Sequence, residues 1–197
     1  MTSKPHSDAC DRNRDPILGV LKEWFIQPGT VLEIGAGTGQ HAVYFAQHLP
    51  HLTWISTDRE ENLDGIRQWF SEAALPNLQG PLKLDVRNEI WPIREARYAF
   101  SANTAHIMSW PEVEAMFAGI SVALDPGGRF CLYGPFNRNG QYTSDSNREF
   151  DEMLQSRNPV MGIRDDRAML ELGRRCEMTF AADYSMPARN RLLVWSK

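Results

Sequence analysis

Glycine and acidic residues at close spacing form the first candidate for chemistry in this chain. Residues 31–39 read Val-Leu-Glu-Ile-Gly-Ala-Gly-Thr-Gly, and an amphipathic segment follows directly. Glycines at 35, 37 and 39 allow a sharp turn and a close approach to a ligand, while a helix that begins near Thr38 directs unpaired amides at an anionic group. Glu33 is placed to hold an ammonium group, directly or through water. The stretch predicts a strand, a loop and a helix around a small anionic or zwitterionic cofactor.

The glycine spacing discriminates between cofactors. A dinucleotide fingerprint requires G-x-G-x-x-G, whereas this chain has G-x-G-x-G with Gln40 in the position of the last glycine. The spacing therefore disfavours nicotinamide and flavin. A generic turn between a strand and a helix in another α/β protein is the alternative interpretation.

Acidic residues follow the next two predicted strands. Asp58 lies 19 residues after Gly39, close to the ~20 residues at which a βαβ unit delivers a carboxylate to ribose hydroxyls. One carboxylate can accept from both hydroxyls, and Arg59 beside it is a further cofactor contact. Asp85 is a candidate acceptor for an adenine amino group, with Val86 against the ring face. A helix-capping role is the alternative for both acids.

The predicted fourth strand ends in Asn103, and the sequence then continues Thr-Ala-His106. Ligands of open α/β sheets bind outside the carboxyl ends of the strands, where the strand order reverses. We therefore expect Asn103 at the cofactor and His106 near the reacting group.

Hydrophobic periodicity and turn residues predict an α/β chain that forms one domain over residues 1–197. Residues 1–13 are expected to be a flexible leader. Residues 137–165 are expected to cover the substrate, with Tyr142 as a recognition side chain. The expected helices span 15–27, 38–49, 60–74, 109–124, 145–156 and 165–175, and the expected strands span 31–34, 52–58, 81–86, 98–103 and 129–133, followed by a hairpin in 176–196 around residues 186–188.

Composition restricts the classes of protein to consider. The 197 residues are 42% hydrophobic, enough for one buried core, and the net charge of -4 disfavours a nucleic-acid partner. The cysteines at 10, 131 and 176 are widely spaced and are expected to be reduced thiols.

No apolar stretch has the length of a signal peptide core or a membrane span, so we expect a soluble cytoplasmic protein with no membrane partner. His41, His48 and His51 lack matched ligands and indicate a solvated face with no metal site.

Together, the glycine turn, Asp58, Asp85 and Asn103 resemble the class I S-adenosylmethionine-dependent methyltransferases. The resemblance implies a Rossmann-like, seven-stranded mixed sheet with helices on both faces and an antiparallel last strand, and it implies S-adenosylmethionine as cofactor. Within it, Glu33, Gly35, Ala36 and Gly37 belong to the first cofactor-binding motif.

Further motifs resemble the methyltransferase-like 26 family from about residue 9 to the C-terminus. They are the stretches at 12–18, 37–42, 84–86, 133–136, 146–151, 157–159, 162–165 and 186–188. Composition alone favours a solvated leader at 12–14, but this resemblance implies that Arg12 to Arg14 are part of the site, with Arg14 near the substrate. Ala36 stands where a serine is frequent. Arg189 stands where asparagine is usual, and we expect it to affect recognition of the acceptor.

Methyl transfer requires little of the protein beyond alignment and desolvation, because the sulfonium already activates the methyl group. His106 is the candidate base for a protonated nucleophile, with a packed histidine as the alternative. Tyr133 and Tyr142 are candidate donors to the acceptor. Residues 103–106 read Asn-Thr-Ala-His and lack the Asn/Asp-Pro-Pro-aromatic signature of exocyclic-amine methyltransferases.

The compact chain and its acidic balance favour a small-molecule O-, N- or S-methyltransferase. One alternative is a protein methyltransferase, which would need an open groove. Another is a non-catalytic protein that binds S-adenosylmethionine and regulates a partner, and a nicotinamide-dependent oxidoreductase is the least favoured. The sequence leaves the acceptor and the oligomeric state open.

Overall fold

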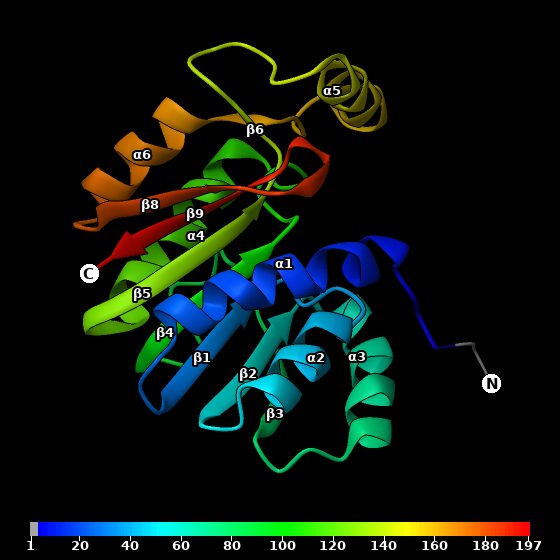
Figure 1. Ribbon diagram of the computed structural model, residues 1–197, viewed down its shortest axis with the longest axis vertical. Helices are drawn as coiled ribbons and strands as arrows, with labels where there is room; N and C mark the ends of the chain where they lie inside the picture. Colours follow the sequence, from blue (N-terminus) through cyan, green and yellow to red (C-terminus); the bar gives the residue numbers. More distant parts are fainter. Residues whose placement is uncertain (1–3) are drawn as a thin grey trace.

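The computed structural model describes residues 4–197, which form a mixed sheet with helices on both faces (Figure 1). The helices are α1 (Asp8–Trp24), α2 (Gln40–His48), α3 (Glu60–Ala73), α4 (Trp110–Ala123), α5 (Asp145–Arg157) and α6 (Asp166–Arg175), with a 3-10 turn η1 (Pro187–Arg189). The strands are β1 (Gly29–Ile34), β2 (Leu52–Asp58), β3 (Leu78–Lys83), β4 (Ala96–Ala102), β5 (Leu124–Gly134), β6 (Phe136–Asn137), β7 (Arg164–Asp165), β8 (Thr179–Ser185) and β9 (Arg191–Ser196).

Seven strands form the main sheet in the order β3-β2-β1-β4-β5-β9-β8. Only β9 runs antiparallel to its neighbours, β5 and β8, as the resemblance implied. β1 pairs on one side with β2 and on the other with β4, so the strand order reverses beside β1. The reversal leaves a crevice at the carboxyl ends of β1 and β4, the place where such sheets bind ligands.

Two apolar layers cover the faces of the sheet. On one face α1 and α2 contribute Ile17, Leu21 and Phe45 to a core that also holds Trp54 of β2. On the other face α4 and α6 pack Phe117 and other side chains against β5 and β9. Residues 4–197 contain no helix with the length and hydropathy needed to cross a membrane.

The first helix begins earlier than the sequence indicated. It starts at Asp8, with Pro16 inside it, so the predicted start at Asp15-Pro16 and the predicted leader over residues 8–13 are wrong. Residues 1–3 of that leader lie outside the described part of the chain. Asp8 and Asp11 stabilise the first turn, because their negative charges lie at the positive end of the helix dipole. Contacts with α2 hold the early turns of α1 in place.

β3 and β5 differ most from their predicted bounds. β3 spans Leu78–Lys83 and contains Pro81, which is tolerated because β3 is an edge strand. Asp85 therefore lies two residues beyond the strand end. β5 starts at Leu124, directly after α4, and so includes residues 125–128, which were expected to lie between a helix and a strand.

Residues 137–165 form a separate small unit beside the sheet (Figure 1). β6 and β7 pair in parallel as a two-stranded sheet, with α5 between them in sequence. Residues 137–165 are called the insert below.

Candidate functional site

A cavity of about 380 Å³ lies at the carboxyl ends of β1, β2 and β4. It brings together residues that are far apart in sequence, as the sheet topology requires. The predicted site residues that line it are Gly35, Ala36, Gly37, Asp58, Arg59, Asp85, Val86 and Asn103. Its volume is in the range of small-molecule sites, roughly 300–1,000 Å³.

Gly35 and Gly37 have different surroundings in the glycine turn. Gly35 has φ +71°, and a Cβ there would lie 2.5 Å from Cγ2 of Thr104, so any side chain at 35 would be strained and would force Thr104 to move. Gly37 has φ +60°, and a Cβ there would meet no atom within 4 Å. Close packing against Thr104, just after β4, favours glycine at position 35. At Gly37 the absence of a side chain leaves space in the cavity wall for a ligand.

Asp58 joins the end of β2 to the glycine turn. Its Oδ2 accepts from the Gly37 amide at 2.6 Å, and its Oδ1 accepts from the Arg59 amide at 2.7 Å and from Nδ2 of Asn62 at 2.8 Å. A carboxylate has about four acceptor positions. One position on Oδ2 is therefore left for a hydroxyl group in the cavity, rather than the two that binding of both ribose hydroxyls would use.

Asp85 is held by Arg87. The guanidinium donates to Oδ1 at 2.9 Å and to Oδ2 at 2.6 Å, and the Arg87 amide also bonds Oδ1. These hydrogen bonds lower the pKa of Asp85 to about 2, so the carboxylate stays ionised. One acceptor position on Oδ2 again remains, on a residue that lines the cavity.

Glu33 lies on β1 beneath the cavity rather than among its lining residues. Its Oε2 accepts from Nε1 of Trp54 at 3.0 Å and from Oγ of Ser56 at 2.5 Å. Burial raises the pKa of this carboxyl to about 7, and the two hydrogen bonds offset only part of the rise. The acid is therefore partly protonated at neutral pH.

The exit of β4 places one predicted residue in the cavity and one behind it. Asn103 lines the cavity with φ +58°, and its amide donates to the Tyr133 carbonyl at 2.9 Å. His106 is buried outside the lining, with its ring 5.3 Å from that of Phe150. Burial, together with the smaller effect of the Arg164 guanidinium, lowers the pKa of His106 to about 4, so the imidazole is neutral.

Arg164 attaches the insert to the turn that follows β4. Its guanidinium donates to the carbonyl oxygens of Ala105 at 3.0 Å and Val160 at 2.9 Å, and to that of Met108. The Gly162 amide donates to the His106 carbonyl at 2.9 Å. Sequence analysis gave Arg164 no role, although it lies in the 162–165 stretch, because a single arginine does not indicate which carbonyl groups it contacts.

The residues predicted to bind the acceptor are not collected at the cavity. The Tyr133 hydroxyl accepts from Asn190, and Tyr142 donates to Asp151 within the insert. Arg14 pairs with Asp11 and stacks on Tyr44, while Arg189 occupies the 3-10 turn with φ +59°. None of the four lines the cavity.

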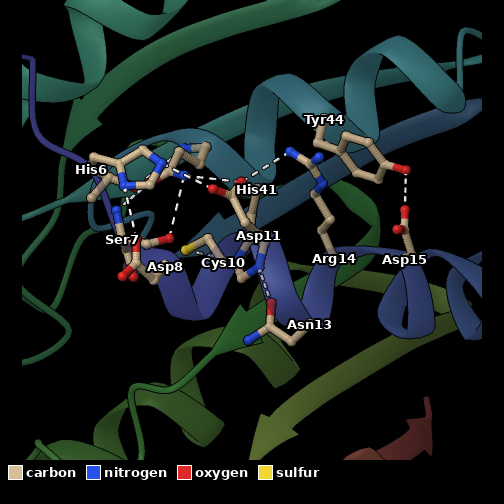
Figure 2. A network of polar contacts seen from close by, with 12 residues as sticks. His6, Ser7, Asp8, Cys10, Asp11, Asn13, Arg14, Asp15, His41 and Tyr44 are labelled. Carbon is tan, nitrogen blue, oxygen red and sulfur yellow. Dashed lines mark hydrogen bonds and ion pairs between the residues drawn. The ribbon is translucent and has the colours of Figure 1, made fainter.

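The beginning of the described chain closes one side of the cavity, which sequence reasoning missed. Ser7 and Cys10 line it together with His41. The Ser7 amide donates to Oε1 of Gln40 at 2.6 Å, and His41 contacts Asn13 (Figure 2). The prediction of a solvated histidine face is wrong for His41, because α1 covers it, and right for the exposed His48 and His51.

The three cysteines are free thiols, as predicted. Over residues 4–197, no three His, Cys, Asp or Glu side chains are grouped so that they could hold a metal ion.

Comparison with known proteins gives a family and a fold. A family model described as a protein of unknown function (DUF938) matches residues 4–197. The fold is similar to that of an O-methyltransferase family protein from Burkholderia thailandensis, at TM-score 0.84 and 16% identity over 96% of this chain and 57% of that chain. The S-adenosylmethionine-dependent methyltransferase SibL is similar at TM-score 0.81 and 19% identity, over 96% of this chain and 55% of that one.

A third similar structure is an O-methyltransferase family 2 protein from Planctomyces limnophilus in complex with apigenin. Its TM-score is 0.76 at 16% identity, over 86% of this chain and 51% of that one. The chain spans about half the length of these solved structures. At this level of identity the similarity establishes the Rossmann-like methyltransferase fold.

Proposed function

The chain belongs to the DUF938 family of proteins of unknown function, and we propose that it is an S-adenosylmethionine-dependent methyltransferase acting on a small-molecule O, N or S acceptor. One observation carries the proposal: the cavity gathers the glycine turn, Asp58 and Asp85 at the reversal of strand order. The motifs quoted above also support a relationship to the methyltransferase-like 26 family.

The side chains around the cavity fit the proposed cofactor. Asp58 and Asp85 each retain one acceptor position, for a ribose hydroxyl and an adenine amino group respectively. Val86 and Met108 supply apolar surface to the cavity lining. The open space at Gly37 leaves room for the backbone to contact a ligand directly.

S-adenosylmethionine supplies an electrophilic methyl group on a sulfonium sulfur. The protein has to hold the acceptor in line with that methyl group and to exclude water, which accounts for most of the expected acceleration. Ser7 and Cys10 close one side of the cavity, and the insert packs beside the β4 exit. A cavity of about 380 Å³ has the size of a small-molecule site, which favours a small acceptor over a protein substrate that would need an extended groove.

His106 is the proposed base for acceptors that carry a proton at neutral pH. Its low pKa keeps the imidazole unprotonated, the form that a base requires. Because its ring lies behind the cavity lining, this role needs a movement of the residues after β4. Once an acceptor is known, His106→Asn should lower kcat with little change in the KM for S-adenosylmethionine. An unchanged kcat would remove His106 as the base.

Calorimetry of the purified chain with S-adenosylmethionine, S-adenosylhomocysteine and NADH tests the proposed cofactor. We expect binding of the first two and none of NADH. If only NADH binds, the chain is an oxidoreductase. Binding of S-adenosylmethionine without turnover across a panel of hydroxyl, amine and thiol acceptors would favour the non-catalytic alternative.

A further inference from the structure

Three side chains from α1 and α2 form a thiol, imidazole and amide series at the wall of the cavity (Figure 2). Cys10 and Asn13 are three residues apart on α1 and therefore share a face of the helix. His41, in the first turn of α2, lies between them. Its Nδ1 is 3.9 Å from the Cys10 sulfur, and its Nε2 is 2.6 Å from Oδ1 of Asn13.

The hydrogen bond to Asn13 fixes the tautomer of His41. Oδ1 of an amide only accepts, so the His41 proton is on Nε2 and Nδ1 presents its lone pair to the Cys10 thiol. Asn13 also affects a neighbouring hydroxyl. Burial raises the pKa of Tyr133, and hydrogen bonding by Asn190 and Asn13 opposes that rise.

Burial keeps both reacting groups uncharged. Burial lowers the pKa of His41 to about 4. The Asp11 carboxylate opposes this shift, and the Arg14 guanidinium adds to it. Burial also raises the pKa of the Cys10 thiol. Hydrogen bonding with Ser7 and Thr38 opposes this rise, and the charges of Glu33 and Asp11 add to it. At neutral pH a protonated thiol thus faces a neutral imidazole, and a proton can pass from sulfur to Nδ1 as the sulfur attacks.

The other two thiols of the chain lack this arrangement. Cys131 is fully buried in the core, and Cys176 is half-buried at the end of α6. Among residues 4–197, neither thiol has a hydrogen bond to a histidine. Cys10 differs from both because it and its base line a cavity that a small molecule can enter.

We propose that Cys10 is a covalent modification site, with His41 as its base, for small uncharged α,β-unsaturated carbonyl compounds that enter the cavity. The sulfur forms a bond to the β-carbon while His41 Nδ1 takes the thiol proton. The π electron pair of the double bond moves to the α-carbon, which receives that proton from His41. The product is a neutral thioether, with no leaving group and no change in net charge.

Four acidic side chains line this cavity against one arginine, Arg59, so the walls disfavour an anionic electrophile and accept an uncharged one. The adduct also has a consequence that rests on the proposed function. A thioether on Cys10 occupies cavity volume, so modification and cofactor binding exclude each other.

The test uses N-ethylmaleimide on the full chain, with the rate at each cysteine followed by mass spectrometry of its peptide from pH 6 to 8. A free thiol reacts through its thiolate, so the rate at Cys176 should rise about tenfold per pH unit. Cys10 uses a base that is neutral throughout this range, so its rate should change less than about threefold. A tenfold rise per unit at Cys10 would overturn the proposal.

His41→Phe removes the base and keeps an aromatic ring against Phe45 and Phe100. We expect the Cys10 rate at pH 7 to fall about tenfold or more and to gain the slope of a free thiol, at the low end of general-base effects. His48→Phe, on the exposed side of the same helix, is the matched control. Cys131 should stay unlabelled, which reports that the variant is folded. An unchanged Cys10 rate in folded His41→Phe would refute the role of His41, and if that variant unfolds, the wild-type pH profile decides.

Protection by S-adenosylhomocysteine separates this inference from the proposed function. Saturating ligand should slow labelling of Cys10 and leave Cys176 unchanged. If calorimetry shows binding without protection, mutual exclusion is wrong. If no binding is found, the proposed function fails, while the pH profile of the free protein still decides whether Cys10 is the modification site.

Discussion

The Gly37 amide donates a 2.6 Å hydrogen bond to Oδ2 of Asp58, and this bond joins the turn after β1 to the end of β2. It fixes the turn from outside its own segment, because the two residues are 21 positions apart. The same carboxylate lines the cavity. Asp58 therefore shapes the candidate site and is also available to a ligand in it.

Asp58→Ala should weaken binding of S-adenosylhomocysteine by roughly 10- to 150-fold, the effect of losing hydrogen bonds to a charged group worth about 1.5–3 kcal/mol. Calorimetry measures this change. Asp64→Asn is the control, because Asp64 is exposed on α3 and pairs with the exposed Arg67. Equal affinity of the wild type and Asp58→Ala would exclude the ribose assignment.

Gly35→Ala should lower the free energy of unfolding by about 1–3 kcal/mol, through a strained φ and a clash with Thr104. Thr104→Ser removes the clashing methyl group and keeps the hydroxyl that contacts Ser101. In urea unfolding, the double variant should regain the steric part of the loss. Gly37→Ala should cost less than Gly35→Ala, because no atom opposes its Cβ. Additive losses in the double variant would show that the clash is not the cause.

Arg164→Ala should loosen the insert, because three carbonyl oxygens lose their common donor. We expect proteolysis within residues 138–163 to accelerate about tenfold, equivalent to ~1.4 kcal/mol of local stability. Arg157→Ala, exposed at the end of α5, is the control. If the two variants are cut at equal rates, Arg164 does not anchor the insert.

Glu33 should make stability fall as pH rises. Folding raises its pKa from the model-compound 4.5 to about 7, so the folded state binds the proton more tightly. The contribution of Glu33 is fully present below about pH 4.5, falls between pH 4.5 and about 7, and is constant above that. Relative to the wild type, Glu33→Gln should gain on the order of 3 kcal/mol at most across this window.

The comparison uses urea unfolding of both proteins at several pH values between 4.5 and 8. His41 and His106, whose pKa values are lowered to about 4, contribute with the opposite sign between pH 4 and 6.5. Their contribution cancels in the difference between the two proteins. Glu95→Gln, at an exposed site, should show no such trend. A difference that stays constant with pH would contradict the assignment to Glu33.

The sequence determined the parts of the site that depend on local spacing. The glycine turn, the bounds of β2 and the polar residues after β2, β3 and β4 follow from runs of apolar residues ended by glycine or an acid. Parallel strands bring their carboxyl ends to one edge, so the convergence of Asp58, Asp85 and Asn103 at the cavity follows from the sequence pattern.

The tertiary structure decided everything that depends on contacts between distant segments. His41 reads as a surface residue of a polar helix, yet Asn13, 28 positions away, and the rest of α1 bury it. Pro81 fits within β3 only because that strand is at the edge of the sheet. Arg164 reaches carbonyl groups 56 and 59 positions away. Burial and pairing of this kind arise from packing between elements, and local sequence patterns do not encode them.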